Sequence, residues 1–204
     1  MRSDAARNRA RILDAARDLV AAQGPEVSMD AIASAAGVAV GTLYRHHPTK
    51  ADLVAAVVED SIEHMAELAE RAAGAVADGA DPAAEVAGLF RAVAERYATD
   101  RLLKSALSAL GDPMPAHPGD YADGSAARRT LAAVESLLGA AERAGVIRPG
   151  IGFNDIYYLL AGAPDAQAPE TARKRYVDIV LAGLLDGGPG WQRREPLGTD
   201  AEGR

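Results

Sequence analysis

The segment from Val27 to Lys50 constrains the fold most, because it carries the start and stop signals of consecutive short helices. Ser28 is a good N-cap for a helix over residues 29–36, and Gly37 can take the left-handed conformation that ends it. A second helix over residues 38–47 follows at once. Two short helices joined by a glycine turn are typical of a helix-turn-helix, in which the second helix is the recognition helix.

A third helix is predicted to begin directly after this pair. Pro48 ends the second helix, and Thr49 and Asp52 have the spacing of a capping box. Lys50 then lies at a helix N-terminus, where a cation opposes the helix dipole. This placement makes sense if Lys50 and the free N–H groups face a phosphate.

The predicted recognition helix has one inward face and a set of outward residues. If Leu43 points inward, the helical period places Ala39, Val40 and His47 roughly with it. Gly41 costs about 1 kcal/mol relative to Ala, and close approach of the backbone to DNA would explain it. Hydroxyl groups and Arg45 suit phosphate oxygens and guanine, and His46 adds a donor. The outward residues are Gly41, Thr42, Tyr44 and Arg45.

The stretches RILDAARDLVAAQG, SMDAIASAAGV, GTLYRH and PTK resemble the TetR-type bacterial transcriptional regulators. The resemblance covers Arg9 to about Val58, and more loosely the helical pattern that follows. One departure is His47, where the family usually has an apolar or aromatic residue, most often Phe. The resemblance implies DNA-backbone contacts from Ser28, Thr42, Tyr44, His46 and Lys50, and base reading by Val40, Gly41 and Arg45.

Composition limits the class of protein. The 204 residues are 49% hydrophobic and 25% charged, which is globular, and they include no cysteine. We see no membrane-spanning run and no secretory signal, so we expect a cytoplasmic protein. The net charge of −7 is uneven: residues 1–50 hold seven basic and five acidic residues (+2), and the remainder holds fifteen and twenty-four (−9). An acidic second domain does not prevent a mildly basic head from binding phosphate.

The sequence predicts an all-α fold of about nine helices in two domains. Residues 1–48 form a three-helix DNA-binding domain, residues 49–187 form a helical effector-binding and dimerisation domain, and residues 188–204 form a disordered tail. A long helix over 49–76 would link the two domains. The other expected elements are helices over 4–22 and 100–111, helices that begin near Pro82, Asn154 and Pro169, a loop over 111–124, and a helix after that loop that ends near Gly145.

The last two helices are apolar nearly all round, so they must be covered on more than one side. We predict that they form a homodimer interface, and the family resemblance implies dimerisation through a four-helix bundle. The alternative is that both helices are buried within one subunit. The predicted interface residues are Ile156, Leu160, Tyr176, Val180 and Leu184.

A small-molecule pocket is predicted between the long helix and the helices that follow it. Because apolar residues at helical spacing are more often plain core, that alternative stays open for each lining residue. The low aromatic content favours a small or aliphatic effector. The candidate lining residues are Met65, Phe90, Tyr97, Leu107, Met114 and Tyr157.

Metal and catalytic sites are weakly indicated. Asp60 and His64 have ligand spacing on one helix face, but no third ligand is apparent, His117 cannot be placed, and an exposed ion pair explains them equally well. No nucleophile elbow, phosphate loop or paired-acid motif is present in the sequence. We therefore expect no cofactor, no metal site and no enzyme.

The sequence thus predicts a repressor that binds a palindromic double-stranded DNA operator as a homodimer and is released by a small-molecule effector. The release mechanism, a swing of the long helix, is implied by the resemblance. Two alternatives remain: a helical DNA-binding protein without an effector, and a ligand-binding or enzymatic helical protein with a vestigial head.

Overall fold

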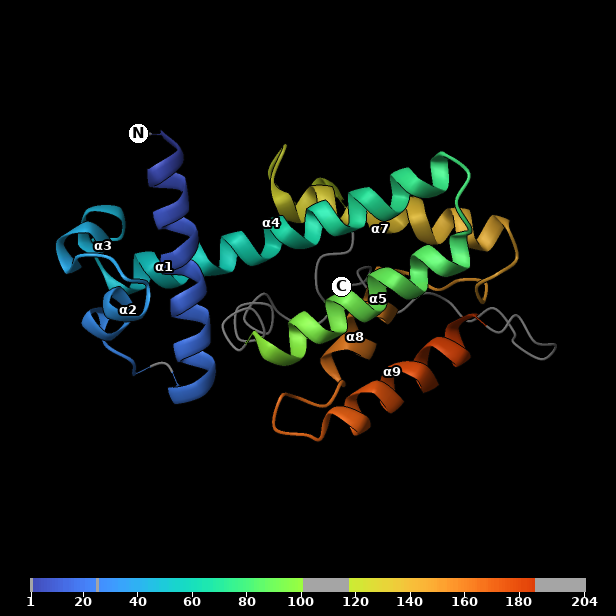
Figure 1. The fold of residues 1–204 in the computed structure, drawn as a ribbon. Coiled ribbons are helices and arrows are strands. Elements are labelled where there is room, and N and C mark those ends of the chain that lie inside the picture. The colour runs from blue at the N-terminus through green and yellow to red at the C-terminus, as the bar shows by residue number, and fades with distance from the viewer. Residues whose placement is uncertain (1, 25, 101–117, 186–204) are drawn as a thin grey trace, which may run out of the picture. The chain divides into compact units, whose positions relative to one another are not determined.

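The chain is all-helical in the computed structural model, which describes residues 2–24, 26–100 and 118–185. Those residues form eight α-helices and one short 3-10 helix, without a strand (Figure 1). This confirms the predicted fold class. The elements are α1 (Arg2–Gln23), α2 (Met29–Ala35), α3 (Val40–His46), α4 (Lys50–Ala77), α5 (Pro82–Thr99), η1 (Pro118–Asp120), α7 (Ala126–Arg143), α8 (Phe153–Ala161) and α9 (Glu170–Leu185).

The chain divides into two compact units. The N-terminal unit contains residues 1–61 and 100–109, and the C-terminal unit contains residues 62–99 and 110–204. The N-terminal unit therefore extends beyond residue 48, where the sequence placed the end of the DNA-binding domain. The reason is that Leu53 and Val57, in the first turns of α4, are buried in the same core as α1, α2 and α3.

The core of the N-terminal unit consists of buried aliphatic side chains from α1 to α4. The seven-residue helices α2 and α3 are too short to be stable alone in water, so packing must hold them. One fully buried side chain from each helix supplies that packing: Ile12 from α1, Ile32 from α2, Leu43 from α3 and Leu53 from α4.

Two clusters of apolar residues form the interior of the C-terminal unit. One joins the later part of α4 to α7 through residues such as Ala69, Val134 and Leu138. The other joins α5 to α8 and α9 through Phe90 and Leu181, among others. Helix α5 contacts α7, α8 and α9, as Figure 1 shows. Helix α5 is therefore the central helix of this unit.

Helix ends agree with the predictions to within a few residues, with one exception in the helix-turn-helix. Helix α3 begins at Val40, two residues later than predicted, because Gly37 has φ +61° and Ala39 is extended with ψ 139°. The predicted helix over 100–111, most of the loop over 111–124, and the tail over 188–204 lie outside the described residues. Within the described ranges, no helix is long and apolar enough to cross a membrane.

Candidate DNA-binding surface

Helix α2 begins at the predicted N-cap. Ser28 has an extended backbone (φ −80°, ψ 154°), and its Oγ accepts a hydrogen bond from the backbone N–H of Ala31 at 3.2 Å. The Ser28 side chain is exposed, and Val27 just before it is buried in the same core as Ile32. Ser28 therefore lies where a hydroxyl can cap the helix and still face a ligand.

The turn between α2 and α3 is fixed by a long-range contact with α1. Gly37 has φ +61°, which disfavours any residue with a side chain. The Arg11 guanidinium donates a hydrogen bond to the Gly37 carbonyl oxygen at 3.0 Å and occupies the space that a Cβ would need. The angle at which α3 leaves the turn is therefore set by Arg11 as well as by the glycine.

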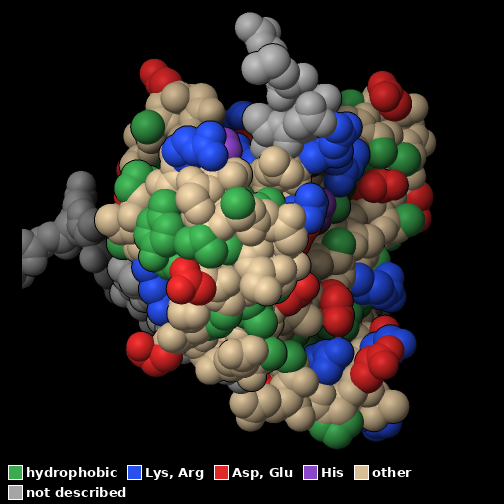
Figure 2. All heavy atoms as spheres, turned by 60° about the vertical axis from the view of Figure 1, so that its left-hand side comes forward, with side chains coloured by type: hydrophobic (Ala, Val, Ile, Leu, Met, Phe, Trp, Pro, Cys, Tyr) green, Lys and Arg blue, Asp and Glu red, His purple; other side chains and the backbone are tan. Residues whose placement is uncertain are grey.

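Helix α3 presents an exposed face of mixed chemistry. Leu43 is fully buried, whereas Val40 is 38% exposed and Tyr44 is 45% exposed. The sequence placed Val40 roughly with Leu43. That placement was wrong, because Val40 is in the first turn, on the side away from the core. Figure 2 shows exposed hydrophobic, Lys or Arg, and His side chains together on the face turned forward.

The polar groups of this face are held only loosely by the protein. Arg45 folds back on its own helix, with its Nε 3.4 Å from the Gly41 carbonyl oxygen and its Nη2 3.4 Å from the Thr42 Oγ1. Both distances are at the long limit of hydrogen bonding, so little energy holds Arg45 there. His46 and Gly41 are exposed, and Thr42 is half-buried.

Lys50 stands beside this face at the first residue of α4. The capping box is present: the Thr49 N–H donates to Asp52 Oδ2 at 2.9 Å, and the Asp52 N–H donates to Thr49 Oγ1 at 3.1 Å. Neither Lys50 nor Tyr44 has a hydrogen-bond or ion-pair partner within the described part of the chain. A cation at a helix N-terminus and an exposed phenol are thus both available to an external anion.

Comparisons with known proteins show which family the chain belongs to. The model of bacterial regulatory proteins of the tetR family matches residues 12–57, and the model of the SbtR-like transcriptional regulator C-terminal domain matches residues 81–186. The chain is 36% identical to a TetR transcription regulatory protein from Mycobacterium vanbaalenii, covering 90% of this chain and 98% of that one, with a TM-score of 0.64. The chain belongs to the TetR family.

Two further similarities support narrower conclusions, one about part of the chain and one about the fold. HTH-type transcriptional regulators of Staphylococcus aureus are 42% identical over 64 residues, 31% of this chain, and the chain matches only 35% of their length. A SmeT–triclosan complex is 21% identical with a TM-score of 0.51, covering 94% of this chain and 99% of that one. The second similarity concerns the fold alone.

His47 stands where the family resemblance implied an apolar or aromatic side chain. The side chain is buried, 6% exposed, at the C-cap of α3, and its Nε2 has no hydrogen-bond partner within the described structure. Burial lowers the pKa of His47, and the positive charges of His46 and Arg9 lower it further, while Asp52 acts in the opposite direction. His47 therefore fills an apolar position as a neutral ring.

The predicted effector-pocket residues are only partly brought together. Met65, Phe90 and Tyr97 are buried, and Tyr157 is half-buried. Burial raises the pKa of Tyr97, and the nearby Tyr157 raises it further, so these two phenols lie within electrostatic reach of each other. Leu107 and Met114 lie outside the described residues. The pocket as a whole stays a prediction.

The predicted dimer residues face mainly their own subunit. Leu160 and Leu184 are buried in the core of the C-terminal unit, and the Tyr176 hydroxyl donates to the Leu159 carbonyl oxygen at 2.6 Å. Ile156 and Val180 are half-buried against the same cluster. The dimer itself stays a prediction, but one other face of α9 is exposed and includes Ala172, Arg175, Ile179 and Ala182.

Sequence reasoning missed a charged network in the N-terminal unit. Arg17 lies 2.6 Å from Asp60, 2.8 Å from Asp14 and 3.5 Å from the buried Asp100, which also accepts a 2.6 Å hydrogen bond from Ser61. Asp60 is therefore the partner of Arg17 and not of His64, which lies 3.9 Å from Glu67. No group of three or more metal-binding side chains occurs within the described ranges.

Proposed function

We propose that this protein is a DNA-binding transcriptional repressor that is released from a palindromic operator by a small-molecule effector. The observation that carries the DNA-binding part is the exposed face of α3 beside Lys50. Within the described chain, Tyr44 and Lys50 have no partner, and Arg45 is held by two long hydrogen bonds. These groups suit phosphate oxygens and base edges.

Useful affinity for DNA requires two such heads. One head offers few phosphate contacts, whereas a two-fold symmetric dimer places two recognition helices about 34–36 Å apart on a palindrome. The exposed side of α9 offers a surface for the second subunit: Ile179 is 62% exposed, and small residues flank it at Ala172, Ala182 and Gly183. Small and apolar residues allow close helix packing.

The proposed effector binds in the C-terminal unit, lined in part by Phe90, Tyr97 and Tyr157. A fold-level neighbour, SmeT, is recorded in complex with triclosan, which supports a small-molecule site in a fold of this kind. The effector acts by binding better to a state of the dimer that fits the operator poorly. Operator then weakens effector binding by the same factor. We propose no enzymatic activity, cofactor or metal.

The test begins with selection of the genomic fragments that the full-length protein binds. The affinity for a selected fragment is then measured for the wild-type protein and for Tyr44→Ala and Lys50→Ala variants. Both variants are expected to lose at least about tenfold in affinity, the equivalent of roughly 1.4 kcal/mol. Arg143→Ala, which removes an exposed cation at the end of α7, is the matched control and is expected to bind normally.

Two outcomes would contradict the proposal. If the Tyr44→Ala and Lys50→Ala variants bound DNA with wild-type affinity, the α3 face would not be the DNA-binding surface. An affinity for DNA that no bound small molecule changes would remove the effector and leave a DNA-binding protein without a ligand, the first alternative from the sequence.

A further inference from the structure

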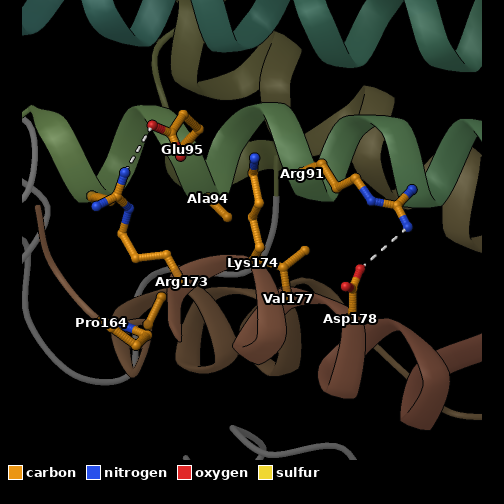
Figure 3. Close-up of a pocket in the computed structure, with 10 residues that line it drawn as sticks. Arg91, Ala94, Glu95, Pro164, Arg173, Lys174, Val177 and Asp178 are labelled. Atoms are coloured by element: carbon orange, nitrogen blue, oxygen red, sulfur yellow. Dashed lines mark ion pairs between the residues drawn. The ribbon is translucent and has the colours of Figure 1, made fainter. Parts of the chain in front are cut away.

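A groove in the C-terminal unit separates α5 from α9 and has a volume of about 290 Å³. Figure 3 shows its residues from both helices facing one another, with Pro164 at one end. The volume is close to the lower end of ligand pockets, about 300–1,000 Å³. None of Met65, Phe90, Tyr97 and Tyr157 is among its lining residues. The groove is therefore distinct from the predicted effector pocket.

The floor of the groove is apolar. Ala94 and Ala98 are buried on α5, and Val177 and Pro164 are half-buried on the opposite side. The end of the groove is closed by a hydrogen bond from the Ala166 N–H to the Ala98 carbonyl oxygen at 3.1 Å. Small side chains on this floor leave room for an aliphatic body, which would bury apolar surface there.

The rim of the groove is charged, with cations in excess. Arg91 and Glu95 lie on the α5 side, and Arg173, Lys174 and Asp178 lie on the α9 side. Two ion pairs span the groove, Arg173 with Glu95 at 3.5 Å and Arg91 with Asp178 at 3.8 Å, and both are longer than a direct hydrogen bond. In Figure 3, Lys174 extends from α9 toward α5 between these two pairs.

Arg173 has binding capacity that the protein leaves unused. Its side chain is only 17% exposed, its Nη1 donates to the Ala168 carbonyl oxygen at 2.9 Å, and its buried Nε has no hydrogen-bond partner within the described residues. Arg173 also lies near the N-terminus of α9, where the helix dipole disfavours a cation, whereas the neighbouring Lys174 is already paired with Glu170 at 2.5 Å. An anion beside Arg173 would relieve both of its costs.

We propose that the α5–α9 groove binds a small amphipathic carboxylate, with its carboxylate on Arg173 and its aliphatic body on Ala94, Ala98 and Val177. The carboxylate replaces the long contact between Arg173 and Glu95. The outward face of α9, around Ile179, lies about half a helical turn away from the groove, so a second subunit on that face leaves the groove open. The site does not depend on DNA binding.

The test uses octanoate as the probe and the full-length protein, with binding measured by calorimetry and located by NMR of labelled alanine methyl groups. We expect one octanoate per chain, with shifts at Ala94 and Ala98. Octan-1-ol and octylammonium, which have the same chain without the carboxylate, are expected to bind more weakly.

Variants on the rim separate this site from other places where octanoate could bind. Arg173→Gln is expected to weaken octanoate at least about tenfold, the equivalent of roughly 1.4 kcal/mol, since it removes a hydrogen bond between two charged groups. Glu95→Gln is expected to tighten it, because a competing carboxylate is removed. Arg143→Gln, which removes an exposed cation of α7 outside the groove, is the matched control and should change nothing.

Three results would overturn the proposal. The first is the absence of saturable binding. The second is octanoate binding that Arg173→Gln leaves unchanged, which would place the probe in another pocket. The third is equal weakening by Arg173→Gln and Arg143→Gln, which would indicate attraction to exposed cations in general and no built site.

Discussion

Gly41 lowers the stability of α3, and no contact within the described residues requires a glycine there. It is the second residue of α3, and among the described residues a Cβ at this position would have no atom within 4 Å apart from its own helix and chain neighbours. A glycine in a helix interior costs about 1 kcal/mol relative to alanine. The missing side chain is therefore useful only for something outside the chain that approaches the helix backbone.

Gly41→Ala is accordingly expected to have opposite effects on folding and on DNA binding. Because Gly41 is the second residue of α3, the free energy of unfolding should rise by less than the roughly 1 kcal/mol of a helix interior, while affinity for DNA falls because the methyl group prevents close approach. Chemical denaturation and DNA titration measure the two effects. Gly74→Ala in α4, where a Cβ would also meet open space, should stabilise the protein similarly without changing DNA affinity.

His47 makes the stability of the N-terminal unit depend on pH. Its pKa is lowered by burial and by His46 and Arg9, and only Asp52 opposes this, so the unfolded chain binds more protons than the folded one. The contribution of neutral His47 to the free energy of unfolding is therefore fully present above about pH 6.5. This contribution is lost as pH falls toward the pKa that His47 has in the folded protein.

Replacing His47 by Phe is expected to remove this part of the pH dependence. It should also raise the free energy of unfolding at pH 7 by about 1 kcal/mol, because the unpaired buried Nε2 is eliminated. Denaturation between pH 5 and pH 8 checks both effects. A His47→Phe profile parallel to that of the wild type would contradict the account.

At the scale of elements, Arg17 of α1 holds together residues that are far apart in the sequence. It pairs with Asp60 of α4 and with the buried Asp100, which directly follows α5, and Asp100 accepts the hydrogen bond from Ser61. All four residues belong to the N-terminal unit. This unit is therefore stabilised by buried charge as well as by its apolar core.

Asp100→Ala is expected to lower the free energy of unfolding by about 3 kcal/mol, because it removes one partner of a buried charged pair. Asp14 is also a partner of Arg17, but its side chain is 69% exposed. Asp14→Ala should therefore cost less than about 1 kcal/mol. Equal effects of the two variants in urea denaturation would contradict the importance of the buried pair.

The short helices of the N-terminal unit could be predicted well because their signals are local. Ser28, Gly37, Thr49 and Asp52 specify caps and a turn within a few residues of where they act, and the structure has each of them. The network around Arg17 could not be predicted, since Asp100 is brought to it only by the tertiary fold.

The same limit applies to α9 and to its groove with α5. Periodicity could not choose a face of a helix that is apolar nearly all round, so the predicted interface included Leu184, which is buried in its own subunit. The groove depends on Arg173 and Glu95 meeting across two helices, and sequence spacing carries no information on that meeting.

In the proposed complex, two copies of the α3 face bind duplex DNA, and Lys50 of each copy contacts a phosphate. The net charge of −7 gives the chain no general attraction to DNA, so specific phosphate contacts must provide the electrostatic part of binding. Each such contact contributes about 0.9 to the slope of log affinity against log salt concentration.

The most direct test is that slope, measured for a genomic fragment that the wild-type protein selects. For a dimer, Lys50→Ala should reduce the steepness of the slope by about 1.8, one contact per subunit, while Arg143→Ala leaves it unchanged. A Lys50→Ala slope equal to that of the wild type would contradict the claim that this lysine, beside the α3 face, binds the DNA backbone.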